Sequence, residues 1–542
     1  MTTARGPAWR AALGGGAALA VATPPAVWPG AEFLVFAGLA AWFAIATAGA
    51  RPFRHTMLLG CVHMVWFSWS VHHALASFLG PIGMVPAFLG IVVLGGLYFV
   101  LGTVAVRRLP PRLAAVGFAL MSAGSFWLRA NMPEIAYPHG QPCHTLWQWP
   151  VLLGSLRLGG ESLANVLCAW LAAVVVEWWR SWRIGAPPWH AGKRGFGIAA
   201  VVACAATVVG NLLEVAPPDA ERRSVSVAAV EPGLHCLDPY LGLGREESRR
   251  THRAAVNERL IGPTRAMLAD GRAPDLVLWP ESSLALWLDG ADIDAGEVVI
   301  DLPRMPIDAL VGTNVDHDRR STPAAVLVDL RNGRAKGHHE KTCLVPGGEF
   351  LPVLRRLPTA LREPVYDALS PLFGMPADCV AGAQRAPLEL ADGTRFGSLL
   401  CYDNAYPAPA AAYVAAGARF LCVLSNESWF RGGSELTQLV ASSVCRALET
   451  CTPLVRCTTD GWTAAVSADG RVLADLPVRP SPAAAARILR IDVPLGAGVL
   501  PPMAWLRAWS GPAVGCLLLA ALLHALVAWA RLRSNRIVTR PN

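Results

Sequence analysis

Charged residues are scarce in this chain, and their scarcity sets the class of protein. Only 16% of the 542 residues are Asp, Glu, Lys or Arg, whereas soluble domains carry roughly 25%. Hydrophobic residues make up 53%, and the mean hydropathy is +0.39. This composition favours a membrane protein over a soluble one.

Several patterns that carry chemistry elsewhere are missing. The sequence has no Cys/His spacing typical of zinc sites and no glycine-rich loop of the Walker type. Its 13 cysteines show no regular framework that would predict disulfides, and there is no internal repeat. We therefore expect no metal and no cofactor. The net charge of +8 does not indicate nucleic-acid binding, because the arginines cluster at the ends of apolar runs.

Long apolar runs are abundant. A membrane-spanning helix needs about 20 mostly apolar residues. Eight segments fit that length: residues 10–28, 31–50, 56–78, 82–106, 113–131, 158–179, 195–215 and 505–530. The first is interrupted by Pro24 and Pro25, and with Arg5 and Arg10 it has a signal peptide as its alternative reading. We prefer a retained helix, because the topology is then consistent throughout.

Basic residues predict the orientation of these helices. If the N-terminus is cytoplasmic, eight crossings place the basic clusters inside, as the positive-inside rule requires. These clusters are Arg51/Arg54, Arg107/Arg108/Arg112, Arg180/Arg183/Lys193/Arg194 and Arg531/Arg533/Arg536. We therefore expect a transmembrane domain of about seven helices at 1–215, an extracytoplasmic domain at 216–502, and a C-terminal helix with a basic cytoplasmic tail at 503–542.

Two polar features interrupt the apolar region. Glu161 and Asn165 fall one turn apart on the sixth segment, and ionisable groups inside a membrane are candidate functional residues, with helix packing or an interfacial position as the alternative. The loop 132–157 contains His139 and His144 beside Cys143. It is rich in proline and lacks a fourth ligand, so we expect an aromatic interfacial loop rather than a metal site.

The polar block alternates apolar runs with helical patterns. The expected strands are SVSVAAVEP, DLVLWPES, DALVGTNVD, AAVLVDL, the run ending at Lys341, FGSLLCYD and RFLCVLS. Helices are expected at 245–269, in the Ala-rich stretch after FGSLLCYD, and in SELTQLVASSVCRALET. LVRCTTDGWTAAVSADGRV and ARILRIDV are expected to end the domain as a hairpin-like pair. This order predicts a layered α/β domain, and continuous apolar strands predict sheets covered on both faces.

Glu281, Lys341 and Cys401 each end one of these runs. A thiol attacks only as thiolate, and a free cysteine has a pKa of about 8.5. A carboxylate can accept its proton as general base, and a lysine can stabilise the thiolate and then an oxyanion. The three residues thus predict acyl or amide chemistry through a thioester. Cys343 is a rival thiol.

The short sequences around these residues are WPES, EKTCLVPGGEF, CYD and SNESWF. Together they resemble the motifs of the nitrilase, or carbon–nitrogen hydrolase, superfamily. This resemblance implies an αββα sandwich in which Glu281 is the base, Lys341 the stabilising cation and Cys401 the nucleophile. With seven spanning helices before the domain and one after it, the chain resembles the apolipoprotein N-acyltransferase family.

Further residues fit the family by position. By resemblance, Glu349 matches an additional essential glutamate, and Tyr402 matches the tyrosine that follows the nucleophile. Asn426 and Trp429 in SNESWF also fit, with turn formation and packing as their structural alternatives. We expect these four residues to support the site or to contact substrate.

The sequence departs from the family at three places. Asp403 stands where the family usually has glutamate, and the first strand ends in Glu231-Pro232-Gly233 instead of Gln-Gly-Asn. Tyr240 stands where the family has a tryptophan in the following loop. These departures affect the fine geometry of substrate binding rather than the three central residues.

A basic amphipathic stretch separates Glu349 from Cys401. In residues 351–376, leucines recur at helical spacing from Leu354, and Arg355, Arg356 and Arg362 fall elsewhere. Such a stretch can lie at a membrane interface and act as a lid. Packing on the domain's own core is the alternative.

The resemblance implies a membrane acyltransferase. A phospholipid would donate an acyl chain to Cys401, and the thioester would pass it to the α-amine of the diacylglyceryl-modified N-terminal cysteine of a bacterial lipoprotein. The site would face the periplasmic side of the cytoplasmic membrane. Alternatives are a membrane-tethered amidase or nitrilase of a small substrate and a non-catalytic membrane binding protein. Eight helices favour a lipid substrate, because a tether needs only one.

Overall fold

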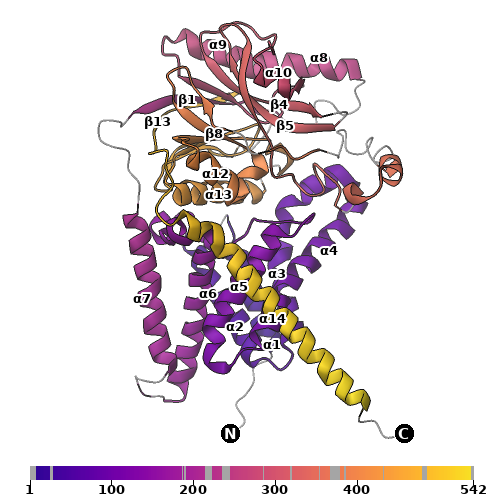
Figure 1. Cartoon of the computed structure of the whole chain (residues 1–542), viewed down its shortest axis with the longest axis vertical. Helices are drawn as coiled ribbons and strands as arrows, with labels where there is room; N and C mark the ends of the chain where they lie inside the picture. Colours follow the sequence, from indigo (N-terminus) through magenta and orange to yellow (C-terminus); the bar gives the residue numbers. More distant parts are fainter. Residues whose placement is uncertain are drawn as a thin grey trace. The chain divides into compact units, whose positions relative to one another are not determined.

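The structure is a computed structural model, and its contacts divide the chain into two units (Figure 1). It describes residues 8–24, 28–185, 187, 191–213, 223–234, 245–284, 286–317, 320–352, 354–365, 379–383, 386–430, 433–478 and 485–538. The helical unit comprises Met1–Ser70, Ile82–Leu213 and Pro502–Asn542, and the sandwich unit comprises Val71–Pro81 and Glu214–Pro501.

Long apolar helices build the helical unit. They are α1 (Ala8–Ala22), α2 (Leu34–Ala48), α3 (Pro52–Ser68), α4 (His72–Val106), α5 (Ala114–Asn131), α6 (Ser155–Arg183), α7 (Ala191–Leu212) and α14 (Ala504–Val538). Among the described residues, six stretches are long and apolar enough to cross a membrane: Ala31–Ala48, Gly83–Val106, Pro111–Asn131, Ser155–Arg183, Arg194–Leu212 and Ala504–Arg531. Five precede the polar block and one follows it, fewer than the seven and one expected.

The first and third expected spans account for the difference. α1 has 15 residues and α3 has 17, below and at the lower end of the roughly 17–25 residues that a crossing takes. The third span, expected at 56–78, is divided because α3 ends at Ser68 and a 3₁₀ turn, η2 (Trp69–Val71), leads into α4. α4 accordingly begins ten residues before the expected start of the fourth span.

The first sheet of the sandwich unit mixes parallel and antiparallel pairs. Its strands are β1 (Ser224–Glu231), β2 (Leu276–Trp279), β3 (Trp287–Asp289), β4 (Asp308–His317), β5 (Arg320–Asp329), β6 (Arg334–Glu340) and β13 (Arg487–Pro494). They follow the order β13-β1-β2-β4-β5-β6, and β3 pairs with β4. β1, β2 and β4 are parallel, whereas β4, β5 and β6 form an antiparallel meander.

The second sheet has the order β12-β11-β10-β9-β8-β7. Its strands are β7 (Leu388–Glu389), β8 (Arg395–Leu400), β9 (Phe420–Ser425), β10 (Leu454–Thr458), β11 (Thr463–Val466) and β12 (Val472–Leu476). β8, β9 and β10 are parallel, and β10 and β11 form an antiparallel hairpin. The last strand was predicted wrongly as part of a terminal pair, because β13 instead pairs with β1 in the first sheet.

Helices cover the outer face of each sheet (Figure 1). α8 (Arg245–Val256), the π-helical turn η7 (Asn257–Ile261), α9 (Gly262–Ala269) and α10 (Gly290–Asp294) belong to the first sheet, and α12 (Pro407–Ala415) and α13 (Glu435–Thr450) to the second. Alternate residues of β1 face opposite cores: Val227 packs between the sheets and Ala228 packs under the helices. Since both faces of the strands are buried, the layers are helix, sheet, sheet and helix.

Candidate active site

Three strand ends present the central polar residues. Glu281 lies two residues after β2, Lys341 directly follows β6, and Cys401 directly follows β8. All three are buried, with Lys341 only 1% exposed. The Lys341 ammonium donates to Glu281 Oε1 over 2.9 Å and to Glu349 Oε1 over 2.6 Å. A buried cation therefore lies between two carboxylates.

A close approach of β4 fixes the position of Glu281. A Cβ atom at Gly312 would lie 2.5 Å from Glu281 Cα and 2.2 Å from the Pro280 carbonyl oxygen, so only glycine fits there. The second carboxylate oxygen of Glu281 accepts the backbone N–H of Asn426 over 2.9 Å. Both oxygens of the candidate base are thus held by hydrogen bonds.

Cys401 occupies an unusual backbone conformation. Its φ is +44°, a left-handed value that costs a non-glycine residue free energy and recurs at active sites. Burial raises the pKa of its thiol, and the Lys341 charge acts in the opposite direction. The turn from β8 into the 3₁₀ helix η9 (Cys401–Ala405) presents this thiol beside Lys341 and Glu281.

The carboxylates near Lys341 stabilise its protonated, ammonium form. Burial alone would lower its pKa, but the carboxylates of Glu281 and Glu349 outweigh burial and raise the pKa well above its ordinary value. Burial raises the pKa of Glu349, and Lys341 opposes that shift. Glu349 is also oriented by the backbone N–H of Val345, 2.8 Å from its Oε2. The lysine therefore stays cationic at neutral pH and is available to stabilise negative charge.

Asp403 is buried and binds the lysine loop, by which we mean Thr342 and Cys343, the residues that directly follow Lys341. Its Oδ1 accepts the backbone N–H groups of Thr342, over 3.0 Å, and Cys343, over 2.7 Å. The shorter side chain that replaces the family's glutamate thus bridges the turn of Cys401 and the loop after Lys341. Tyr402 is buried, and its ring packs against Tyr406 with centroids 5.5 Å apart.

The motif SNESWF follows β9. Asn426 Oδ1 accepts hydrogen bonds from the hydroxyls of Ser428, over 2.7 Å, and Thr459, over 2.8 Å. Trp429 lies in the turn η10 (Ser428–Phe430) and is partly exposed. The structure therefore brings the backbone of Asn426 to the site, while its side chain organises the local turn, as the structural alternative predicted.

One departure from the motif of the resembled family, Glu231, lies at the end of the first strand. Glu231 is fully buried, and its Oε1 lies 2.6 Å from Nη2 of Arg487 on the paired strand β13. This ion pair links β1 to β13. Tyr240, expected to replace a tryptophan of the family, lies outside the described residues.

The rival thiol has a different environment. Burial raises the pKa of Cys343 to about 12, and the carboxylate of Asp403 adds to the shift. The backbone N–H of Cys343 donates to Asp403, so Cys343 has a structural role in the loop after Lys341. For Cys401, in contrast, the Lys341 ammonium is the largest influence that opposes burial. Burial raises the pKa of both thiols and Lys341 opposes it at both, so these shifts do not decide between them, and Cys401 as the nucleophile stays a prediction.

Sequence reasoning missed His339 and Tyr413. His339 Nε2 lies 2.9 Å from Asp403 Oδ2, and its Nδ1 lies 2.7 Å from the Tyr413 hydroxyl. A signal for His339 was present, because residues two apart on a strand share a face and His339 precedes Lys341 by two. Tyr413 carried no such signal, since it belongs to α12, far away in sequence.

The described part of the amphipathic segment is largely exposed. Leu361 is 60% exposed and Leu357 is 36% exposed, so these leucines do not pack on the domain core. The guanidinium of Arg355 lies 4.1 Å from the ring centroid of Phe350, and residues 359–365 are helical. Of the two alternatives, these observations favour a surface segment.

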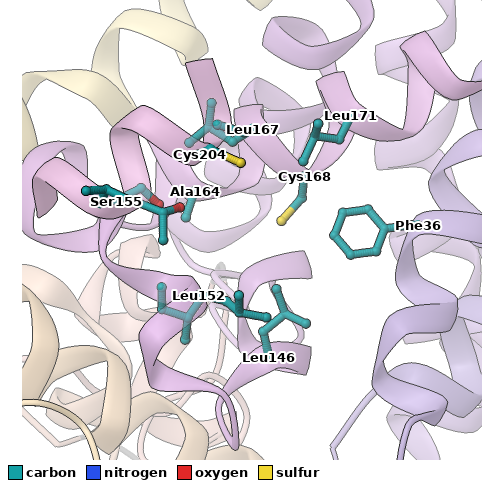
Figure 2. A pocket seen from close by; sticks show the side chains of 13 residues that line it. Phe36, Leu146, Leu152, Ser155, Ala164, Leu167, Cys168, Leu171 and Cys204 are labelled. Atoms are coloured by element: carbon teal, nitrogen blue, oxygen red, sulfur yellow. The ribbon is translucent and has the colours of Figure 1, made fainter. Parts of the chain in front are cut away.

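The helical unit contains an apolar cavity of about 280 Å³ (Figure 2). Its walls come from α2, α6, α7 and the short turns η4 (Pro142–Leu146) and η5 (Pro150–Leu153). Figure 2 shows Phe36, Leu146, Leu167 and Leu171 among its lining side chains. The chemistry of this lining suits hydrocarbon groups.

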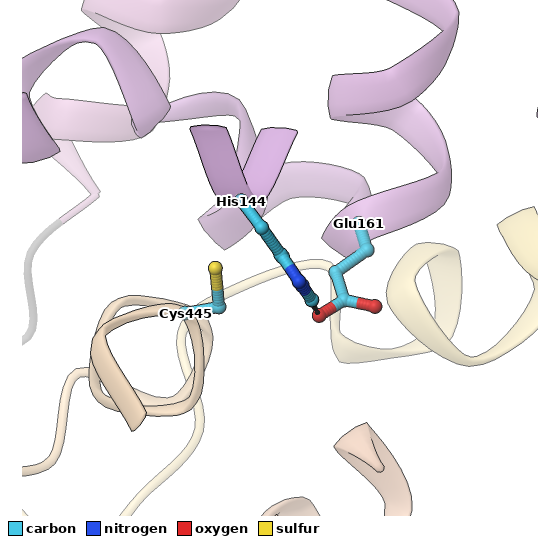
Figure 3. A group of neighbouring side chains, drawn as sticks. All are labelled: His144, Glu161 and Cys445. Atoms are coloured by element: carbon cyan, nitrogen blue, oxygen red, sulfur yellow. Dashed lines mark hydrogen bonds and ion pairs between the residues drawn. The ribbon is translucent and has the colours of Figure 1, made fainter. Parts of the chain in front are cut away.

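Part of the loop 132–157 is anchored to α6, and its expected place at a membrane interface stays a prediction. Residues 138–147 are buried. His144 lies 2.7 Å from Glu161 Oε1 (Figure 3), and Asn165 Oδ1 accepts the backbone N–H of Cys143 over 3.0 Å. Glu161 and Asn165 thus anchor the loop to α6, which supports the packing alternative for both. That the loop holds no metal stays a prediction.

Two family models match the chain. "Carbon-nitrogen hydrolase" matches residues 249–482, and "Apolipoprotein N-acyltransferase N-terminal domain" matches residues 15–174. The first match covers most of the sandwich unit, and the second covers much of the helical unit.

Curated relatives carry the name apolipoprotein N-acyltransferase. The protein of Geobacter metallireducens is 30% identical over 40% of each chain, and that of Brucella suis is 26% identical over 53% of this chain and 52% of the relative. The chain thus spans about half the length of these relatives. The protein of Gloeobacter violaceus is 27% identical over 85% of this chain and 84% of its own length.

Solved structures show weaker similarity. An amidase from Nesterenkonia sp. is 17% identical, with coverage of 53% of this chain and 96% of that chain and a TM-score of 0.31. Saccharomyces cerevisiae Nit3, a nitrilase superfamily member, is 13% identical over 50% of this chain and 90% of that chain, with a TM-score of 0.32.

Proposed function

Because the chain belongs to the apolipoprotein N-acyltransferase family, we propose that it moves an acyl chain from a phospholipid to a bacterial lipoprotein. The acceptor is the α-amine of the lipoprotein's diacylglyceryl-modified N-terminal cysteine. One observation supports this chemistry above all others: the buried Lys341 ammonium lies between Glu281 and Glu349 beside the thiol of Cys401.

In the first half-reaction, Glu281 accepts the thiol proton of Cys401. The thiolate sulfur attacks the ester carbonyl carbon of the phospholipid, and the carbonyl electrons move onto oxygen. Lys341 stabilises this oxyanion, an effect worth roughly 3–4 kcal/mol of barrier per donor. The ester C–O bond then breaks, and Glu281 returns the proton to the departing lysophospholipid oxygen. The product is a Cys401 thioester.

In the second half-reaction, the neutral α-amine of the acceptor attacks the thioester carbonyl. Lys341 again stabilises the oxyanion, and Glu281 accepts a proton from the nitrogen. The C–S bond breaks and leaves an amide on the lipoprotein. The proton held by Glu281 returns to the thiolate and regenerates Cys401. Both halves use the same residues, which is the pattern of covalent nucleophilic catalysis.

The surrounding residues support these steps. Glu349 orients Lys341 and keeps it charged, and the backbone N–H of Asn426 holds Glu281. We assign Tyr402, Trp429 and Tyr240 to substrate contact as hypotheses. No cofactor enters either half-reaction.

The topology completes the proposal. Among the described residues, five candidate spans precede the catalytic domain at 216–502, which we place in the periplasm, and the segment 503–542 returns to the cytoplasm as one helix and a basic tail. An odd number of crossings before the domain keeps it on the side opposite a cytoplasmic N-terminus. With this arrangement the thiol has access to phospholipids of the outer leaflet of the cytoplasmic membrane. The exposed leucines and arginines of 354–365 suit a membrane-facing segment that covers the thioester.

The decisive experiment traps the intermediate. Purified protein is incubated with phospholipid that carries a labelled acyl chain, and the label on the protein is tested with hydroxylamine, which cleaves thioesters. We expect a hydroxylamine-sensitive label that Cys401→Ser abolishes and Cys343→Ser preserves. Addition of a peptide with a diacylglyceryl-modified N-terminal cysteine should move the label to the peptide.

Three outcomes would contradict the proposal. Hydrolysis of small amides without any label from phospholipid would favour a membrane-tethered amidase. Loss of label in Cys343→Ser with retention in Cys401→Ser would identify a different nucleophile. Neither label nor hydrolysis, in protein that binds lipid, would favour a non-catalytic binding protein.

A further inference from the structure

We infer that His339 is a positioning residue, which orients Cys401 and Lys341 relative to each other through the carboxylate of Asp403. The inference rests on the proposed function, because it concerns the geometry of the same thiol and ammonium. It assigns a role to a histidine for which the half-reactions themselves have no use.

One oxygen of Asp403 binds the lysine loop. Oδ1 accepts the backbone N–H of Thr342 over 3.0 Å, the Thr342 hydroxyl over 2.8 Å and the backbone N–H of Cys343 over 2.7 Å. These donors directly follow Lys341 in the chain. Asp403 thereby fixes the conformation of the backbone that directly follows Lys341 at the end of β6.

The other oxygen of Asp403 binds His339 and the turn that holds Cys401. Oδ2 accepts the backbone N–H of Leu400 over 3.1 Å and lies 2.9 Å from His339 Nε2. Leu400 precedes Cys401, whose φ is +44°. A strained residue keeps its conformation only where its surroundings hold it, and Asp403 supplies one such constraint.

His339 in turn is fixed from its far side. The Tyr413 hydroxyl lies 2.7 Å from Nδ1, and the two rings pack edge to face with centroids 5.6 Å apart. His339, Asp403 and Tyr413 are all fully buried. If the Tyr413 hydroxyl donates to Nδ1, then Nε2 carries the proton and donates to Asp403. This assignment satisfies all three groups.

The network connects side chains from three elements. Tyr413 lies on α12, His339 on β6, and Asp403 on η9. Because a displacement of about 1 Å at reacting groups can cost on the order of 100-fold in rate, loss of His339 should slow chemistry at Cys401 even though His339 touches no substrate.

The adjacent histidine provides a matched control. His338 is as buried as His339 but lies on the opposite face of β6, where it pairs with Glu340 over 3.0 Å and Asp294 over 3.1 Å. His338→Gln changes the same residue type in the same strand without touching Asp403. It separates a general weakening of β6 from a specific effect on the site.

The experiment compares His339→Leu, His339→Gln and His338→Gln in the full-length protein. The readouts are the alkylation rate of Cys401 by iodoacetamide, followed on its peptide by mass spectrometry, and the single-turnover rate of acyl labelling from phospholipid. We expect His339→Leu to slow both rates roughly 10- to 100-fold. His339→Gln should stay within a few-fold of wild type, since its amide can donate to Asp403. His338→Gln should leave both rates unchanged.

Unchanged rates in His339→Leu would overturn the inference, as would equal losses in all three variants. If His339→Leu fails to fold, Tyr413→Phe replaces it, and an unchanged alkylation rate there would also overturn the inference. Alkylation needs no acyl donor. A wild type that is alkylated at Cys401 but never labelled by phospholipid would therefore refute the proposed function, while the alkylation rates would still decide the role of His339.

Discussion

The ammonium of Lys341 lies 2.6 Å from the carboxylate of Glu349, a shorter contact than its 2.9 Å bond to the candidate base. The lysine therefore has a carboxylate partner besides the one that must accept a proton. Glu281 can become protonated during the reaction without leaving Lys341 unpaired in a buried site.

Glu349→Gln tests this division of roles. The glutamine amide keeps the shape of the Glu349 side chain but removes its negative charge. Of the carboxylates of Glu281 and Glu349, both of which contact Lys341, only that of Glu281 then remains. We expect single-turnover thioester formation to slow roughly 10- to 100-fold, with folding preserved. The rate is measured by rapid-quench labelling with acyl-labelled phospholipid. A wild-type rate would mean that Glu349 has no part in the charge balance.

Lys341→Met tests the ammonium itself. Removal of one partner from a buried ion pair costs roughly 3–5 kcal/mol of stability, and loss of an oxyanion donor costs roughly 100- to 1,000-fold in rate. We expect both losses, measured by thermal unfolding and by acyl labelling. The double variant Lys341→Met/Glu349→Gln should recover part of the stability and none of the rate. Recovery of the rate would exclude Lys341 from the chemistry.

Much of the sandwich was predictable because its strands are continuous apolar runs between polar loops. β1, β4 and β9 lie where their sequences indicated. β3 was missed because three residues carry no periodic signal, and β13 was misassigned because only long-range pairing places it beside β1. Local pattern identifies a strand, but the partner of a strand depends on packing far away in sequence.

The candidate site likewise contains residues that could be predicted from the sequence and residues that could not. Glu281, Lys341 and Cys401 could be predicted because each ends an apolar run inside a distinctive motif. The contact of Asp403 with the lysine loop and its partner His339 could not, since they depend on how two sheets stack. In the helical unit, apolar length alone could not reveal that the polypeptide turns at Trp69–Val71.

Asp403 should make stability depend on pH. Burial alone would raise its pKa, but hydrogen bonds from His339 and Thr342 and the charge of Lys341 lower it below the ordinary 3.8. A lowered folded-state pKa gives stability that is fully present above the unfolded value. That stability is lost as the pH falls below about 4 and through the folded pKa. Asp403→Asn should therefore unfold more easily at neutral pH, by about 1–3 kcal/mol.

The measurement is the unfolding midpoint of both proteins between pH 7 and pH 3. The difference between them should be largest at neutral pH and should shrink as the solution becomes acidic. A difference that is constant across this range would show that the charge of Asp403 does not contribute.

Gly312→Ala tests how β4 positions the base. The new Cβ would lie 2.2 Å from the Pro280 carbonyl oxygen, so the backbone before Glu281 must move. We expect roughly 1–3 kcal/mol of destabilisation and a loss of acyl labelling on the order of 100-fold. Gly195→Ala in α7 is the control, because nothing lies within 4 Å of its Cβ. Full activity in Gly312→Ala would show that Glu281 tolerates displacement.

The orientation of the sandwich unit makes a prediction in whole cells. Asp392 lies in an exposed turn of that unit, and Ile184 is 74% exposed after α6, next to the basic cluster that includes Arg183. If the positive-inside rule holds here, a membrane-impermeant maleimide added to spheroplasts should label Asp392→Cys at once. It should label Ile184→Cys only after the membrane is permeabilised. The background is a chain in which Cys204 and Cys516, the exposed cysteines among the described residues, are alanine. The reverse pattern would place the thiol of Cys401 in the cytoplasm, where the proposed lipoprotein acceptors are not exposed, and would require a different substrate.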